Sequence, residues 1–265
     1  MTDAPSPSRW IGFRLRCAFF GAFLAVAHSS TAVGSGQPDV LVIGQSVQGR
    51  EITALLWNDQ AEQPATLVLG AVHGDERESG VLAELLAARW QRNPSLLGGK
   101  RVILIPKMNP DGWDANSRGN ARGVDLNRNF SVGWEKKKRG RWDYSGTAPL
   151  SEPEARAVHA LMQAGPIERI VTLHSCRTCG GVNNFDGPAR RLAILMRQFN
   201  GYRVLDEWPS PTPGSFGTFA GKHSNIPTIT LEMPRNKTSE DDFKRSAAAI
   251  EALITAVERV SSVLN

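Results

Sequence analysis

The chain has 265 residues, of which 41% are apolar and 22% are charged, and its formal net charge is +5. This length and apolar content allow a single α/β domain with a full hydrophobic core. The net charge is modest, and basic residues do not alternate with aromatic ones, which argues against a nucleic-acid partner. The basic run 136–141 is therefore predicted to be a solvated loop rather than a polyanion site.

The first 32 residues have the order of a secretory signal peptide. Arginines precede an apolar block, 17–27, and small residues continue to Ala32. The block is too short to span a bilayer. We expect a signal peptide over 1–32, cleaved after Ala27 or Ala32, with a retained membrane tether as the alternative. The folded domain, 37–263, is then expected to be periplasmic or secreted and not inserted in a membrane.

Two cysteines remain after removal of the leader, Cys176 and Cys179. In an oxidising compartment such a pair can close a small disulfide. We see no thioredoxin-like pattern around it, so a structural loop staple is the preferred interpretation.

Apolar periodicity predicts an alternation of strands and helices. The expected strands are 39–44, 51–56, 67–72, 101–106, 169–174 and 228–234. The expected helices are 76–90, 151–163, 189–199 and one from about 241, and a capping box at 151–154 is expected to open the second. A long irregular stretch, 109–149, interrupts the pattern, as functional loops often do. The predicted fold is one α/β domain with a central mixed, largely parallel sheet and helices on both faces.

Two histidines end predicted apolar strands. His73 is followed three positions later by Glu76, where Gly74 is expected to let the chain turn, and His174 ends the strand 169–174. In an open α/β sheet such strand ends gather on one edge, where ligands bind. Two His and one Glu leave a fourth position open for water, as in catalytic zinc sites. The alternative is two structural histidines at strand ends.

Several motifs, in this order, resemble the zinc carboxypeptidase family. They are 73–76 (HGDE), 109–112 (NPDG), 123–130 (GVDLNRNF), His174 and the strand segment Leu231–Glu232. The resemblance extends from about Gly44 to the end of the chain. Within it, 150–154 and 212–217 are similar to bacterial murein peptide amidases, which cut the bond between γ-D-glutamate and meso-diaminopimelate in cell-wall peptides.

The resemblance implies one zinc ion per chain. Its ligands would be His73, Glu76 and His174. Asp125 matches the carboxylate that orients the first histidine and fixes its tautomer. From the sequence alone, Asp125 could equally cap a turn.

The resemblance also implies how a peptide would be bound and cut. Glu232 matches the general base, and Arg118 matches the arginine that polarises the scissile carbonyl. Asn127 and Arg128 match the pair that grips the terminal carboxylate, and Ser175 is a further expected substrate contact. Taken singly, the arginines could be solvated loop charges and Glu232 a surface charge on an edge strand.

Two features depart from the family pattern. The loop 207–211 lacks the tyrosine that digestive members carry there, so a tyrosine cap over the substrate is in doubt. The cysteine pair directly follows the His174–Ser175 step, where relatives often have a cis peptide bond. We therefore expect a strained cis bond between Ser175 and Cys176.

The favoured function is zinc-dependent hydrolysis of an amide bond beside a free carboxylate, with a murein peptide as the substrate. A carboxypeptidase that releases ordinary C-terminal residues is the main alternative. An aspartoacylase-like deacylase shares the Asp-Leu-Asn-Arg run at 125–128, but the turn 109–112 and the ending Asn129–Phe130 favour the peptidase branch. A non-catalytic binding module would be indicated by loss of a ligand or of the base, and none of them is missing.

Overall fold

Eight strands form one sheet in the computed structural model, which describes residues 37–60, 62–206 and 208–257. The strands are β1 (Asp39–Gln45), β2 (Glu51–Trp57), β3 (Ala65–Leu69), β4 (Arg101–Ile105), β5 (Ile167–Cys176), β6 (Val182–Asp186), β7 (Arg203–Leu205) and β8 (Thr228–Pro234). Their spatial order is β1-β2-β4-β3-β5-β8-β6-β7. The predicted signal peptide lies outside the described residues.

The middle of the sheet is parallel and its flanks are mixed. Strands β4, β3, β5 and β8 run parallel to one another. The hairpin of β1 and β2 joins antiparallel through β2 at one side, and β6 pairs antiparallel with β8 at the other. The predicted α/β class with a mixed, largely parallel sheet is therefore confirmed.

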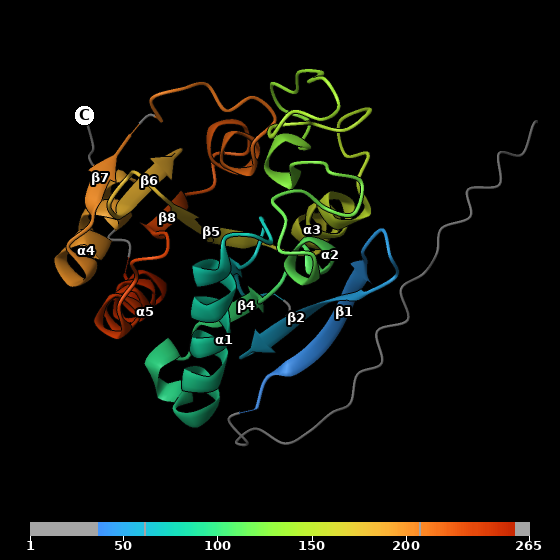
Figure 1. Cartoon of the computed structure of the whole chain (residues 1–265). Coiled ribbons are helices and arrows are strands. Elements are labelled where there is room, and N and C mark those ends of the chain that lie inside the picture. Colours follow the sequence, from blue (N-terminus) through green and yellow to red (C-terminus); the bar gives the residue numbers. More distant parts are fainter. Residues whose placement is uncertain (1–36, 61, 207, 258–265) are drawn as a thin grey trace, which may run out of the picture. The chain divides into compact units, whose positions relative to one another are not determined.

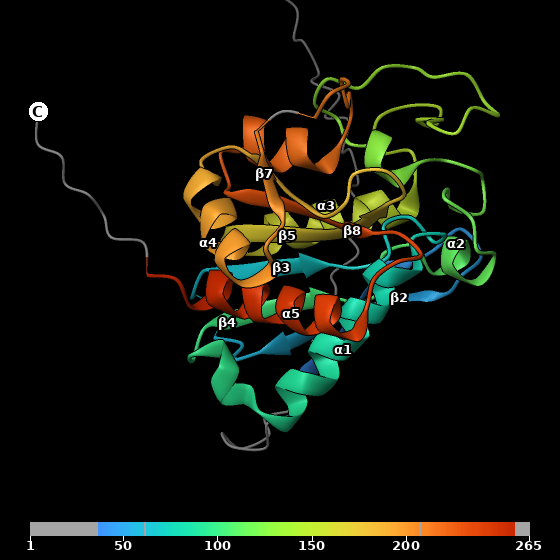
Figure 2. The same ribbon diagram turned by 60° about the vertical axis from the view of Figure 1, so that its left-hand side comes forward.

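Helices cover both faces of this sheet (Figures 1 and 2). One face packs against α1 (Arg77–Arg92), α4 (Arg190–Asn200) and α5 (Glu240–Thr255). The other face packs against α3 (Pro153–Ala164) and the short helix η3 (Thr218–His223). The remaining short helices are η1 (Pro94–Leu97), α2 (Pro110–Asp114) and η2 (Leu126–Arg128).

Strand alternation assigns side chains to the two cores. In β8, Ile229, Leu231 and Met233 are fully buried under the α1, α4 and α5 layer. Each such side chain contributes on the order of 1.5–3 kcal/mol through burial. Thr230 and Glu232 point to the opposite face, as the period of two requires. Because β8 lies between β5 and β6, Glu232 is on an interior strand and the edge-strand alternative is wrong.

Two local predictions fail for physical reasons. Strands β6 and β7 are not among the predicted strands: Asn183 and Asn184 interrupt the apolar pattern of β6, and β7 has only three residues. The capping box at 151–154 is wrong: α3 begins at Pro153, and its N-cap residue, Glu152, makes no side-chain capping hydrogen bond. Instead, the Ser151 hydroxyl donates to the Glu152 carboxylate at 2.7 Å, so this serine serves the loop and not the helix.

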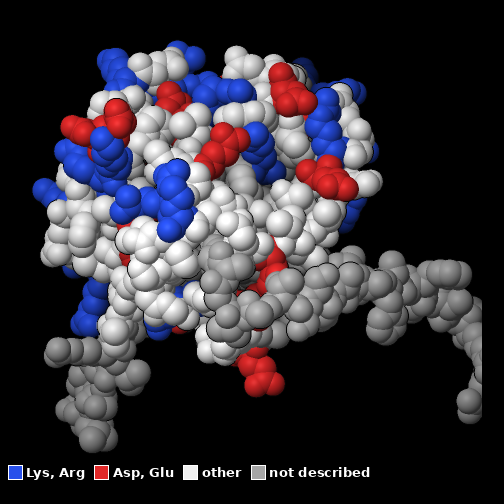
Figure 3. Space-filling model, turned by 90° about the horizontal axis from the view of Figure 1, so that it is seen from below, with Lys and Arg blue, Asp and Glu red and all other residues white. Residues whose placement is uncertain are grey.

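The surface seen in Figure 3 carries Lys and Arg side chains interspersed with Asp and Glu, around a central area with few charges. No single-sign stripe dominates the part of this face that is not grey. Within residues 37–60, 62–206 and 208–257, no helix is long and apolar enough to cross a membrane.

Candidate active site

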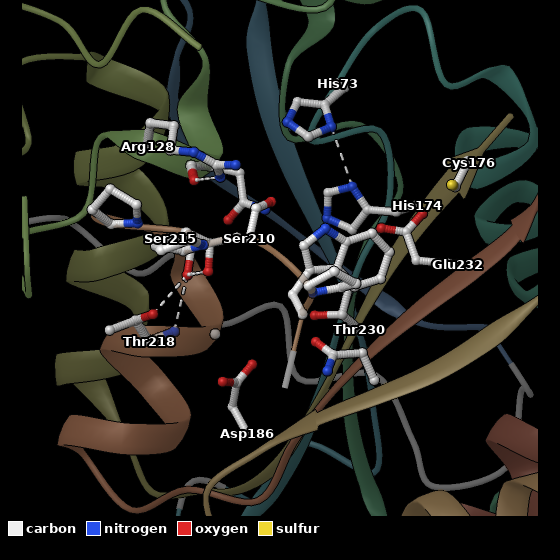
Figure 4. A pocket seen from close by; sticks show the side chains of 18 of the residues that line it. His73, Arg128, His174, Cys176, Asp186, Ser210, Ser215, Thr218, Thr230 and Glu232 are labelled. Carbon is white, nitrogen blue, oxygen red and sulfur yellow. Dashed lines mark hydrogen bonds between the residues drawn. The ribbon is translucent and has the colours of Figure 1, made fainter. Parts of the chain in front are cut away.

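A cleft of about 860 Å³ opens at the carboxyl ends of the parallel strands, where α/β sheets bind ligands. Its lining combines residues from the turn after β3, the end of β5, the face of β8 and the long loop between β4 and α3. Figure 4 shows His73, His174 and Glu232 close together at one end of this cleft.

Three side chains converge on one point there: His73, Glu76 and His174. Their potential ligand atoms all lie within 4.8 Å of one another, and all three residues are buried. The Glu76 carboxylate is 2.8 Å from Nδ1 of His73 and 2.9 Å from Nδ1 of His174. The two Nδ1 atoms are 3.2 Å apart, although 101 residues separate them in sequence.

This donor set fits a zinc ion. Two imidazole nitrogens and one carboxylate are the ligand types of catalytic zinc sites. Two ring nitrogens that face each other at 3.2 Å can share only one proton, whereas a cation between them uses both lone pairs. Among the described residues, this is the cluster of His, Cys, Asp or Glu side chains that meets the geometry of a metal site.

The turn that carries His73 is held by backbone contacts. The backbone N–H of Asn109 donates to Ala71 O at 3.1 Å, and the side-chain oxygen of Asn109 accepts from Gly112 N at 2.9 Å. A side chain on Gly74 would overlap the backbone of Gly112 in α2. The chain turns at Gly74 as predicted, with Glu76 N donating to His73 O at 3.3 Å. Gly74 does not have a positive φ, so a glycine is required here by the close approach to α2.

Asp125 connects the metal cluster to the long loop. This fully buried carboxylate is 2.9 Å from Nε2 of His73 and accepts from Arg118 Nε and Nη2 at 3.0 and 2.9 Å. It also accepts from the backbone N–H of Asn127 at 2.9 Å and so caps η2. The contact with His73 and the turn-capping contact are thus both present.

Electrostatics at the cluster are dominated by these contacts. Burial and the Arg118 charge act to lower the pKa of His73, but the Glu76 and Asp125 carboxylates outweigh them and raise it to about 9. Burial acts to raise the pKa of Glu76, but the two histidines hold it well below its usual range. The cluster therefore concentrates negative charge on Glu76 and Asp125, which suits a cation.

Glu232 faces the cluster from β8. It pairs with His174 in the parallel ladder between β5 and β8 and lines the cleft. Burial raises the pKa of Glu232 to about 8, and the Glu76 charge adds to this rise. Within the part of the chain that the structure describes, no side chain donates a hydrogen bond to the Glu232 carboxyl group, so no hydrogen bond stabilises its ionised form.

Asn127 and Arg128 lie on η2 at the wall of the cleft. The Asn127 carbonyl oxygen Oδ1 accepts from Phe216 N at 2.9 Å, which fixes its side chain. Arg128 is 8% exposed and its Nη1 donates to Asn127 O at 2.6 Å. Arg118 is also not a solvated loop charge, because it donates to Glu76 as well as to Asp125.

The loop after His174 differs from the prediction in one peptide bond. No peptide bond in the described residues is cis, so the predicted cis bond between Ser175 and Cys176 is wrong. Ser175 N donates to Glu76 Oε2 at 3.0 Å, and the Ser175 hydroxyl donates to Glu78 Oε2 at 2.8 Å. Cys176 and Cys179 form a disulfide, in agreement with the predicted loop staple.

The far end of the cleft contains residues that the sequence did not point to. These residues are Asp186, Asn184 and Asp206, and Lys222 lines the cleft with them. Asp186 ends the unpredicted strand β6, and nothing in its local sequence marks it as a cleft residue.

A buried cluster of two histidines and one glutamate with a further carboxyl group beside it is the arrangement used by metal-dependent hydrolases. Comparisons with known proteins agree with this class. The zinc carboxypeptidase family matches residues 33–179. Murein peptide amidase A of Escherichia coli K12 is 30% identical over 226 residues, which cover 80% of this chain and 88% of that protein. Human carboxypeptidase Z is 29% identical over 243 residues, covering 77% of this chain but 35% of that protein.

A solved structure supports the same assignment. The murein-tripeptide amidase of Escherichia coli O157 superposes with a TM-score of 0.68 and 26% identity, covering 84% of this chain and 94% of that one. The chain therefore belongs to the zinc carboxypeptidase family, whose members depend on zinc. It is a hydrolase similar to the murein peptide amidases.

Proposed function

We propose that the domain 37–263 hydrolyses the amide bond between γ-D-glutamate and meso-diaminopimelate in murein peptides, in the periplasm or outside the cell. The observation that carries this proposal is the cleft itself, in which the His73, Glu76 and His174 cluster shares one cavity with Arg128. The similarity to murein peptide amidases over most of their length supports the choice of substrate.

In this proposal His73, Glu76 and His174 hold one zinc ion per chain. Zinc, when bound, lowers the pKa of a coordinated water and polarises a carbonyl group. Asp125 holds His73 in the tautomer that offers Nδ1, because its carboxylate accepts the proton on Nε2 at 2.9 Å.

Glu232 is the proposed general base. Its unpaired carboxylate takes the proton of the attacking water and then returns it to the leaving amine. A cation held by His73, Glu76 and His174 would favour the ionised form of Glu232 by Coulomb attraction, so the pKa of about 8 would fall when the site is loaded. Arg118 donates hydrogen bonds to the oxygen that becomes negative in the transition state.

Arg128 and Asn127 are the proposed anchor for the free carboxylate of the substrate. A guanidinium binds a carboxylate through two parallel hydrogen bonds, which fixes both the position and the orientation of the terminal residue. Burial lowers the pKa of Arg128, but an arginine stays charged at any physiological pH. Ser175 lines the same cleft and is a proposed substrate contact.

Release of ordinary C-terminal residues is the second candidate. The similarity to human carboxypeptidase Z favours it, because that relationship spans 77% of this chain. The two candidates use the same zinc site and differ only in the residue that leaves.

The test compares the zinc-loaded protein on three peptides: L-Ala-γ-D-Glu-meso-diaminopimelate, its C-terminally amidated form, and a tripeptide of ordinary L-residues. We expect cleavage of the first only, and loss of cleavage with a chelator. Glu232→Gln is expected to lose about 10²- to 10⁴-fold in kcat while zinc content is unchanged. Glu240→Gln, on the exposed first turn of α5, is the matched control.

Full activity of Glu232→Gln would show that Glu232 is not the base. Cleavage of the ordinary tripeptide in preference to the murein tripeptide would favour the second candidate.

A further inference from the structure

The far end of the cleft lies on the same face of the sheet as Glu232. In the antiparallel ladder of β6 and β8, Val182 pairs with Glu232 and Asp186 pairs with Thr228. Since side chains alternate along a strand, Asp186 and Glu232 project to one side. Four residues of strand separate the two pairs, which corresponds to roughly 13 Å. In Figure 4 Asp186 lies well away from His174 and Glu232, with Thr230 between.

Asp186 has an environment built around its side chain. Its side chain is 14% exposed. A Cβ atom added to Gly217 or Gly221 would overlap Asp186, so these two glycines let η3 pack directly against it. Within residues 37–60, 62–206 and 208–257, no group donates a hydrogen bond to the Asp186 carboxylate, and its nearest cation is Lys222.

Lys222 provides a charge of opposite sign but does not satisfy Asp186. Its Nζ is 3.9 Å from Asp186 Oδ1, which is beyond hydrogen-bond range. The Lys222 side chain is about half exposed (53%) and lines the cleft. Both groups therefore keep free hydrogen-bonding capacity that points into one cavity.

The cleft wall beside Asp186 and Lys222 is held in place by side-chain hydrogen bonds. Asn184 donates through Nδ2 to Leu205 O at 3.0 Å and to Asp206 O at 3.3 Å. Burial raises the pKa of Asp186, the Lys222 charge opposes this, and Asp206 adds to the rise. A partly desolvated carboxylate of this kind is stabilised when a bound ligand brings an ammonium group to it.

We propose that Asp186 and Lys222 form the end of the side-chain subsite and recognise a terminus that carries both an amino group and a carboxylate. Asp186 accepts from the ammonium group, and Lys222 donates to the carboxylate. This inference rests on the proposed function and assigns the residues that would bind the distal end of meso-diaminopimelate.

Other side chains match this pair less well. An apolar side chain would cover the Asp186 carboxylate without pairing it, which costs free energy. Lysine would satisfy Asp186 but would leave Lys222 beside a second cation. Diaminopimelate differs from lysine only by the carboxylate on its distal carbon. A comparison of peptides that end in diaminopimelate and in lysine therefore tests the contribution of Lys222 directly.

The experiment measures kcat/KM of the zinc-loaded protein for L-Ala-γ-D-Glu-meso-diaminopimelate and for L-Ala-γ-D-Glu-L-Lys. We expect kcat/KM to be about 10- to 100-fold higher for the first peptide. This ratio corresponds to the free energy of one charge-assisted hydrogen bond. Lys222→Met should abolish most of this preference, because it lowers activity on the diaminopimelate peptide and does not lower activity on the lysine peptide. Asp186→Asn should lower activity on both peptides, mainly through KM.

The matched control is Lys244→Met, since Lys244 is exposed on α5 and does not line the cleft. Zinc content and the unfolding midpoint verify that each variant is folded. An unchanged preference in folded Lys222→Met would overturn the inference. Failure of the proposed function is a different result, because the unmodified protein would then cleave neither γ-D-glutamyl peptide.

Discussion

Asp125→Asn tests whether the long loop controls the metal site. The native carboxylate is 2.9 Å from Nε2 of His73 and accepts twice from Arg118, at 3.0 and 2.9 Å, in a fully buried position. Asparagine has almost the same shape but no charge and a single acceptor oxygen. Its NH₂ group must therefore face either the imidazole N–H or the guanidinium, both of which are donors.

Loss of such a supporting carboxylate weakens metal binding by about 10- to 100-fold, or about 1.4–2.7 kcal/mol. The assay is competition for zinc against a chromophoric chelator near neutral pH, with the unfolding midpoint measured in parallel. Asp241→Asn is the control, because Asp241 is an exposed acid in the first turn of α5. A zinc affinity within twofold of the unmodified protein, in a folded variant, would refute the argument that Asp125 orients His73.

Three further outcomes are expected. Zinc binding to the apoprotein should release protons at neutral pH. The pKa of His73 is raised to about 9 and that of Glu232 to about 8, so both groups are protonated before the cation binds. The zinc affinity should therefore rise with pH up to about 9, and calorimetry in buffers of different ionisation enthalpy counts the protons; buffer-independent heats would contradict this. Glu251→Leu should lower the free energy of unfolding in urea by about 1–3 kcal/mol, because it leaves the buried indole N–H of Trp90, now 3.1 Å from the carboxylate, without an acceptor. Gly74→Ala should lose zinc and stability together, since its Cβ would overlap the backbone of α2; a variant with normal zinc content would show that the turn can relax.

Local pattern was enough for most of the secondary structure. The apolar runs of β3, β4 and β5 are continuous because these strands are buried on both faces, and β8 alternates because one of its faces lines the cleft. The prediction failed where side chains serve the loop or the cleft, as in β6 with its Asn183–Asn184 pair. These residues are polar for reasons of tertiary contact, which a local window does not contain.

The candidate site divides in the same way. His73 and Glu76 are three residues apart, so one turn after β3 brings their side chains together. The sequence by itself determined these two of the three members of the cluster. The agreement of the sequence with the family pattern also pointed to His174 and Glu232. The sequence could not show that β5 and β8 are neighbours, which places His174 beside Glu232 in the ladder.

Only the tertiary structure decided which residues close the far end of the cleft. Asp186 and Lys222 lie on different elements, and the packing of η3 against β6 brings their charged groups to 3.9 Å. The physical reason is that sheet order and strand register are collective properties of the whole core, set by the burial of both faces at once. Sequence periodicity reports which face of each element is buried, but it does not report which elements meet.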